Sequence, residues 1–258
     1  MRRYLLTAGI FFLSLSCVSA AVDKWRDAKS THFIVYYKNA PMSFIDKTIH
    51  KAEYYYNKIA DDLGFRRFNF WLWDNRAKIY IHDDAQAYQE VTGQPGWSRG
   101  CAIILSKEIH TFSFAQDFFD TTLPHEMGHI VFRELVGFYN PAIPAWLDEG
   151  VASYAEETVH SNAKRAVKGA LLDNSFIGLE RLSGMSPHTM RDIDMIRLFY
   201  SESVSIVEYL VKAFGKDNFI LFCQNLRDKQ DLQRAIASVY PFRNTGELDA
   251  AWRKYLQK

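Results

Sequence analysis

The feature that most constrains the fold of this chain is a change in hydrophobic periodicity near residue 115. Before it, residues 31–37 and 77–81 are rich in β-branched and aromatic side chains, and residues 101–105 form a third apolar run of strand length. Between the first two runs, residues 43–63 carry apolar side chains at helical spacing. We therefore expect a small mixed sheet with a covering helix in the first part of the chain.

After residue 115 the pattern is mostly helical, with glycine and proline between the apolar segments. The expected helices are residues 121–136, 144–158, 191–213, 216–226 and 246–256. The fold class is therefore α+β, with a sheet lobe over residues 21–116, a helical lobe over residues 117–258 and a functional site between them.

Composition supports an ordinary globular protein, because 48% of the 258 residues are hydrophobic. Lys and Arg number 31 against 30 for Asp and Glu. This balance argues against the concentrated basic surface that nucleic-acid binding requires, so we expect no nucleic-acid partner.

The N-terminus has the pattern of an export signal. Arg2 and Arg3 precede an apolar run over residues 4–16, and the small residues at 18–20 suit cleavage by signal peptidase. The apolar run is too short to span a bilayer. We therefore expect residues 1–20 to be removed, no membrane span to remain, and the exported protein to be periplasmic or secreted.

The three cysteines suggest no binding site. Cys17 lies in the expected signal, but Ser14 stands where a lipobox has leucine, so a lipoprotein is disfavoured. Cys101 and Cys223 could pair in an oxidising compartment or remain two buried thiols. Neither has a second cysteine within a few residues, as a cysteine metal site would need.

The sequence HEMGH at residues 125–129 carries the chemistry. His125 and His129 are four residues apart, which on a helix places both imidazoles on one face, able to bind one ion. A helix is expected here because residues 120–122 offer N-cap oxygens, Pro124 suits the first turn and Gly137 can end the helix.

A second expected helix, PAWLDEGVASYAE at residues 144–156, supplies carboxylates. A catalytic zinc takes three protein ligands and keeps one position open, and two His with one Glu is a well-attested set. Glu149 is the expected third ligand. Asp148 points about 100° away on a helix, so only one of the two faces the metal, and the other lies on the surface or supports a ligand.

Together, HEMGH and PAWLDEGVASYAE resemble the gluzincin zinc metallopeptidases of the peptidase MA-like group, and the helix pair is similar to the aminopeptidase N type. The resemblance implies a zincin-like fold, Zn²⁺ held by His125, His129 and Glu149, and Glu126 as the general base. It also implies that Glu156 orients a ligand histidine, as outer-shell groups at metal sites do.

Residues 200–210, YSESVSIVEYL, resemble the tyrosine-bearing helix of the same enzymes. The resemblance implies that Tyr200 donates a hydrogen bond to the oxyanion that develops during hydrolysis. The alternative is that Tyr200, one of 14 tyrosines, only packs.

The function that follows is an exported zinc-dependent peptidase acting on peptides or proteins. Zinc lowers the pKa of its bound water toward about 7, and Glu126 takes the proton and passes it to the leaving amine. The chain has no G-x-M-E-N stretch, which in the aminopeptidases holds the free amine of the substrate. Residues 96–105 are expected to form an edge strand that pairs with an extended peptide, which favours an endopeptidase.

The sequence allows two other interpretations. Residues 96–100, GWSRG, match the G-x-S-x-G nucleophile elbow of serine hydrolases, but an elbow needs a strand before the serine and a helix after it, whereas Pro95 precedes this turn and a strand follows. The second is a catalytically silent scaffold that keeps the zinc and binds peptide. The presence of Glu126 argues against it.

Overall fold

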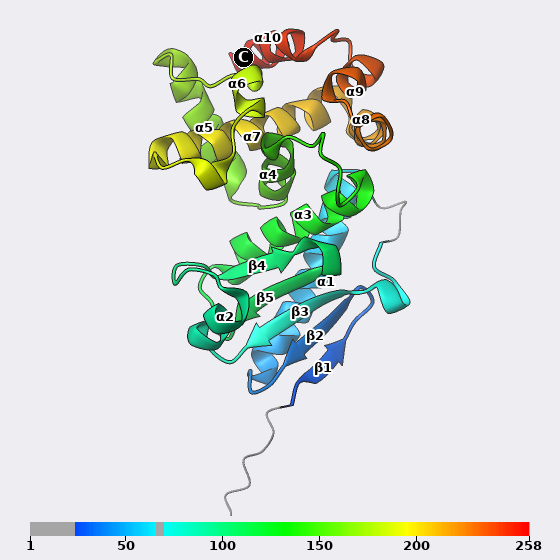
Figure 1. The fold of residues 1–258 in the computed structure, drawn as a ribbon, viewed down its shortest axis with the longest axis vertical. Coiled ribbons are helices and arrows are strands. Elements are labelled where there is room, and N and C mark those ends of the chain that lie inside the picture. Colours follow the sequence, from blue (N-terminus) through cyan, green and yellow to red (C-terminus); the bar gives the residue numbers. More distant parts are fainter. Residues whose placement is uncertain (1–23, 66–69, 258) are drawn as a thin grey trace, which may run out of the picture.

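The computed structural model describes residues 24–65 and 70–257, and its first part is a five-stranded sheet in the order β1-β2-β3-β5-β4 (Figure 1). The strands are β1 (Arg26–Lys29), β2 (Phe33–Tyr37), β3 (Ala77–His82), β4 (Gly100–Ile103) and β5 (Glu108–Phe112). The three central strands are parallel, and β1 and β4 are antiparallel edge strands. The α+β class with a small mixed sheet is confirmed.

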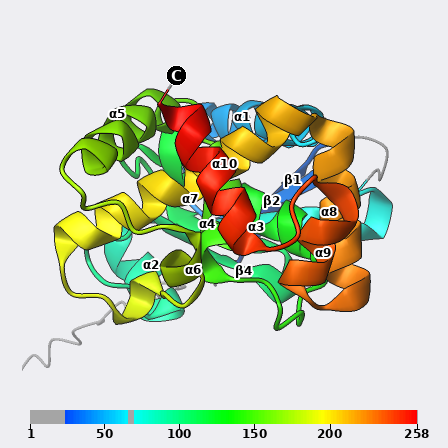
Figure 2. The same cartoon turned by 90° about the horizontal axis from the view of Figure 1, so that it is seen from above.

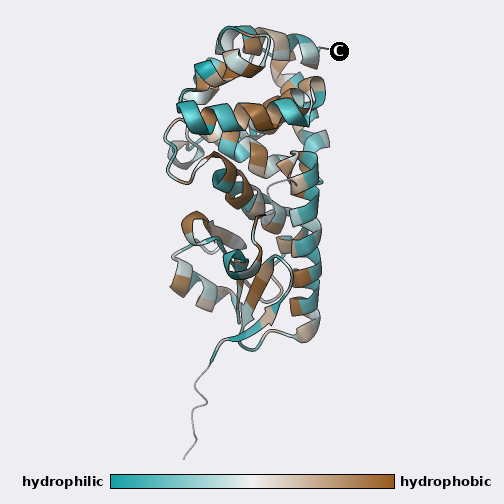
Figure 3. Cartoon of the chain, turned by 90° about the vertical axis from the view of Figure 1, so that its right-hand side faces the viewer, coloured by the Kyte–Doolittle hydropathy of each residue, from teal (hydrophilic) through white to brown (hydrophobic). Residues whose placement is uncertain are grey.

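One face of the sheet is apolar and packs against helices. Val35, Ile79 and Ile109 share this face and are fully buried. The long helix α1 (Met42–Asp62) and α3 (Leu123–Val136) cover it, while the short helix α2 (Ala85–Thr92) lies on the other side (Figure 1). Hydrophobic and hydrophilic residues alternate along these helices, as one-sided burial requires (Figure 3).

The second part of the chain is helical and lies beyond α3 from the sheet (Figure 1). Its helices are α4 (Ala145–Tyr154), α5 (Val159–Leu172), α6 (Leu179–Ser183), α7 (Ile193–Phe214), α8 (Lys216–Lys229), α9 (Leu232–Val239) and α10 (Thr245–Leu256). The central α7 packs against α4, α5 and α8, and α10 crosses its outer side (Figure 2).

Two glycines set how closely α4 is held between α3 and α7. A Cβ on Gly128 of α3 would lie 2.8 Å from the Cα of Ala152 in α4, and a Cβ on Gly150 would lie 2.4 Å from the backbone oxygen of Ser203 in α7. Both distances are too short for a side chain, so the helices approach backbone to backbone. This approach fixes the position of α4 relative to the HEMGH helix.

The expected strands and helices are present, with shifted ends and several additions. The run at 101–105 is a strand only to Ile103, after which the chain forms a 3₁₀ turn, Ile104–Ser106. The elements that the periodicity did not predict are β1, β5, α2, α5, α6 and α9.

The start of α3 differs from the expectation of a side-chain N-cap. Residues Phe118–Thr122 form a π-helical turn that runs directly into α3, and the Thr122 side chain makes no capping hydrogen bond. Because the turn is continuous with the helix, its carbonyls take the first N–H groups and no capping oxygen is needed. Pro124 lies in the first turn and Gly137 ends the helix with φ +96°, as expected.

The expected signal, residues 1–20 with Cys17, lies outside the described residues. Within the described part, no helix combines the length and the apolar character that crossing a membrane requires. Cys101 and Cys223 are both free thiols, so the disulfide alternative is not realised.

Candidate metal centre

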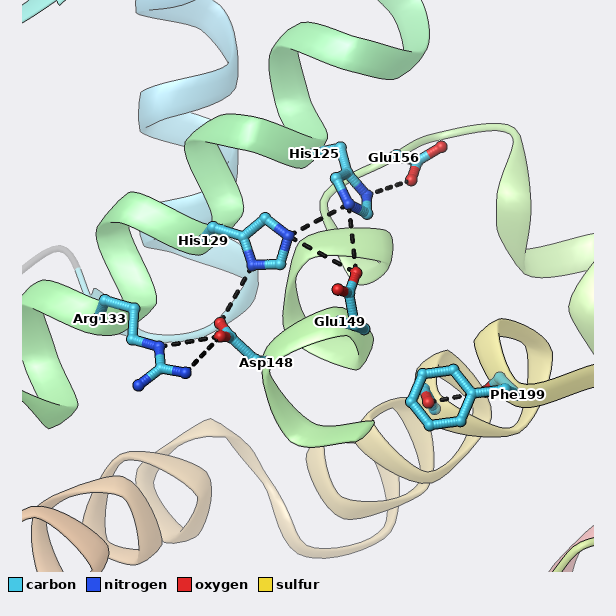
Figure 4. A network of polar contacts seen from close by, with 8 residues as sticks. His125, His129, Arg133, Asp148, Glu149, Glu156 and Phe199 are labelled. Carbon is cyan, nitrogen blue, oxygen red and sulfur yellow. Dashed lines mark hydrogen bonds and ion pairs between the residues drawn. The ribbon is translucent and has the colours of Figure 1, made fainter. Parts of the chain in front are cut away.

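Three potential ligand atoms converge between α3 and α4 (Figure 4). The Nε2 atoms of His125 and His129 are 3.2 Å apart, and the carboxylate oxygen Oε2 of Glu149 lies 3.5 Å and 3.6 Å from them. The two histidines come from adjacent turns of one helix, and Glu149 comes from the first half of the next. Among the described residues, this is the one cluster of three such ligands.

The spacing fits a tetrahedral zinc ion. Ligand atoms about 2.0–2.1 Å from zinc at tetrahedral angles lie roughly 3.3 Å from one another. The three observed separations are close to this value. Glu149 Oε2 is also buried with no hydrogen-bond partner, which would be costly unless a cation occupied the space between the three atoms. The residues present therefore fit zinc.

Each histidine is held from behind by a carboxylate. His125 Nδ1 donates to Glu156 at 2.8 Å, and His129 Nδ1 donates to Asp148 at 3.1 Å (Figure 4). Because an ionised carboxylate only accepts hydrogen bonds, each Nδ1 carries a proton, and Nε2 is the atom of each ring that would offer its lone pair to a metal. Arg133 fixes Asp148 in turn, donating to its Oδ2 through two nitrogens at 2.9 Å and 2.6 Å.

The histidines and carboxylates of the cluster shift one another's pKa values. Burial opposes protonation, but the carboxylates of Glu149 and Glu156 raise the pKa of His125 to about 9, and those of Asp148 and Glu149 raise that of His129 to about 10. Burial alone would raise the pKa of Glu149, but the two imidazoles lower it well below its usual value. A metal ion that binds here therefore replaces protons.

In the sequence of α3, Glu126 lies between the two ligand histidines, and it borders the edge strand β4. Burial raises the pKa of its carboxyl, and the neighbouring histidines and the backbone N–H of Ala102 in β4 act in the opposite direction. The candidate base is therefore next to both the metal ligands and the strand expected to hold a peptide.

A cavity of about 400 Å³ opens beside the triad. His125, Glu126 and Glu156 line it, together with Tyr200 from α7. Burial raises the pKa of Tyr200, so its hydroxyl stays protonated and able to donate. A larger cavity of about 470 Å³ lies between α1 and residues 114–120, away from the three ligand atoms.

The structure thus brings all six predicted site residues to one region: His125, Glu126, His129, Glu149, Glu156 and Tyr200. Asp148, left open by the sequence, supports His129. Arg133 was not anticipated, although its position four residues after His129 places it on the same helix face.

Ser98, the serine of the G-x-S-x-G match, and His160 have structural roles. Ser98 is buried, bonded to the hydroxyl of Tyr88 at 2.7 Å, and precedes a strand rather than a helix, so it is not a nucleophile elbow. His160 hydrogen-bonds the carbonyl of Tyr154 at 3.2 Å and is not among the residues of the metal cluster.

Comparison with known protein families identifies a match to a peptidase superfamily. The family model described as the Peptidase MA superfamily matches residues 72–258, which is more than half of the chain. A search of curated proteins found no significant match. The matched region contains β3, the edge strand β4 and every residue of the candidate centre.

Proposed function

Because the chain belongs to the peptidase MA superfamily, we propose that it is an exported zinc-dependent endopeptidase. The observation that carries the proposal is the convergence of two imidazole nitrogens and one unpartnered buried carboxylate oxygen beside Glu126 and an open cavity. Three ligands with an open fourth position are typical of catalytic rather than structural zinc.

When bound, zinc would polarise the scissile carbonyl and acidify the attacking water. Glu126 takes the proton from that water and delivers it to the leaving amine, so one carboxylate acts as base and then as acid. Burial raises the pKa of Glu126, which makes its carboxylate a better proton acceptor for this double role. Tyr200 donates its hydroxyl to the oxyanion that forms on the substrate carbonyl.

Two features support cleavage within a chain rather than at its amino terminus. β4 pairs with β5 on one side only, and its other edge can pair with an extended peptide. The sequence also lacks the G-x-M-E-N stretch that binds a free amine in the aminopeptidases. The proposal that the protein is exported rests on the signal pattern of residues 1–20.

The test compares the wild-type protein with Glu126→Gln and Glu149→Ala, measuring zinc per mole and cleavage of an unstructured protein such as casein. We expect about one zinc and cleavage for wild type, zinc without turnover for Glu126→Gln, and loss of both for Glu149→Ala. Zinc binding without cleavage by wild type would instead favour the silent scaffold, and well-folded protein that binds no zinc would refute the metal site.

A further inference from the structure

The cavity beside the metal centre has a wall that the proposed chemistry does not use. The loop before β4 contributes Trp97 and Arg99 to the lining of this cavity, which Glu126 and Tyr200 also line. Trp97 is 78% exposed at the rim. A flat aromatic surface and a cation at the mouth of a peptide-sized cavity are features that select substrates.

This loop is held firmly in place. The hydroxyl of Thr111 donates to the Arg99 carbonyl at 2.8 Å, and Ser98 bonds both the Tyr88 hydroxyl at 2.7 Å and the Gly100 carbonyl at 3.1 Å. A Cβ on Gly100 would lie 2.9 Å from the Thr122 side chain, so the loop also packs against the π-helical turn before α3. The wall is therefore preorganised rather than a mobile flap.

Arg99 is a cation without an anionic partner. One of its terminal nitrogens, NH1, donates to the carbonyls of Gly96 and Ser98 at 3.1 Å and 3.3 Å, which orients the guanidinium. Among the residues described, no carboxylate lies within 4.0 Å of it, whereas six other described arginines each pair with one. The other charged groups of the cavity, His125, Glu126 and Glu156, belong to the metal centre.

The direction of β4 indicates which part of a substrate meets Arg99. Antiparallel pairing is the more stable arrangement per residue, so a bound peptide would run opposite to Gly100–Ile103. Its carboxyl-terminal side then lies toward Gly100 and the loop. The cavity is also lined by residues 121–122 of the π-helical turn before α3, against which Gly100 packs.

We infer that Arg99 binds a carboxylate on the part of the substrate that follows the cleaved bond, and that this peptidase selects acidic sequences or free carboxyl termini at that position. The inference rests on the proposed function. A guanidinium whose orientation is already fixed can pair with a carboxylate through two parallel N–H bonds, a geometry that lysine cannot reproduce.

The test uses fluorogenic peptides in matched pairs, with Glu or Gln at the first and second positions after the cleaved bond, each as a free acid and as a carboxyl-terminal amide. A third pair places Glu or Gln before the bond. We expect wild type to favour the downstream carboxylate by about tenfold to a hundredfold in kcat/KM, the range of a charge-assisted hydrogen bond, and to be indifferent upstream. A preference that survives in the amides identifies an acidic side chain, and one that needs the free acid identifies the terminus.

Arg99→Gln should bring the downstream ratio close to one, Arg99→Lys should restore part of it, and Arg234→Gln, an exposed arginine on α9, should leave it unchanged. Equal ratios in wild type and Arg99→Gln, or a preference only upstream, would overturn the inference. Calorimetric binding of the same peptides to Glu126→Gln, with and without Arg99→Gln, gives a readout independent of turnover. If wild type cleaves no peptide, the proposed function fails, while this binding difference still decides the role of Arg99.

Discussion

The pair of Asp148 and Arg133 offers a sharp test of how the metal site is supported. The Asp148 carboxylate accepts one hydrogen bond from His129 and two from Arg133. In Asp148→Asn the amide can still accept from one partner, but its NH₂ group must face a donor of the other. The variant therefore loses the charge that favours protonation of Nδ1 and leaves the lone pair of Nε2 less well directed.

The expected magnitude follows from the role of such outer carboxylates, whose loss typically weakens metal binding by about 10–100-fold. Converted at about 1.36 kcal/mol per factor of ten, this is roughly 1.4–2.7 kcal/mol of zinc-binding free energy. The assay is competition for zinc against a chromophoric chelator at fixed pH. Asp228→Asn is the matched control, because Asp228 is an exposed aspartate that also pairs with an arginine.

Glu156→Gln should weaken zinc binding by a similar factor, since it removes the equivalent support from His125. A zinc Kd for Asp148→Asn within about threefold of wild type, in protein with unchanged thermal stability, would refute this account. In that case packing on α3 alone would orient His129.

Three further predictions follow from the geometry. Gly150→Ala should destabilise the protein by about 3 kcal/mol, because the new Cβ meets a backbone carbonyl of α7. Gly169→Ala should stabilise it by about 0.5–1 kcal/mol, because a Cβ there has nothing within 4 Å. Chemical denaturation measures both free energies of unfolding, and equal effects would contradict the packing argument. Without a bound metal, the pKa values of His125 and His129 lie at about 9 and 10, above the value of about 6.5 for an unfolded histidine. The stability that these two groups contribute is therefore complete below pH 6.5 and is lost as the pH rises through 9–10. A Tm of the zinc-free protein that stays constant between pH 6.5 and pH 10 would contradict this prediction. Tyr200→Phe should lower kcat by about 10²–10³-fold with zinc content unchanged, and an unaltered kcat would mean that Tyr200 only packs.

The parts of the fold that the sequence predicted are those with a regular apolar stripe. The unpredicted β5 shows why the others were missed. It is a central strand, but His110 and Glu108 point to the outer face, where His110 stacks on Tyr80 with ring centroids 4.8 Å apart. A strand that buries polar rings on one face has no clean alternation of apolar and polar residues.

The unpredicted helix α5 fails the periodicity criterion for a different reason. Its buried positions are Ala163, Val167 and Ala170, which are spaced as a helix requires but are mostly small. β1, with the sequence RDAK, has almost no apolar content and is held by main-chain pairing to β2. In both cases tertiary contact, rather than local hydrophobicity, determines the structure.

The candidate centre was more predictable than the fold around it, because helical geometry alone relates its ligands. His125 and His129 share a face through their spacing of four, and Glu149 needs only one further fact, the distance between two helices. The backbone contact at Gly128 supplies that distance, and no periodicity in the sequence reveals it. A larger residue at that position would move α4 outward and carry Glu149 away from both imidazoles while leaving the HEMGH motif intact. The motif is therefore necessary for the site but not sufficient, and the glycine within it links the packing of two helices to the assembly of three ligands.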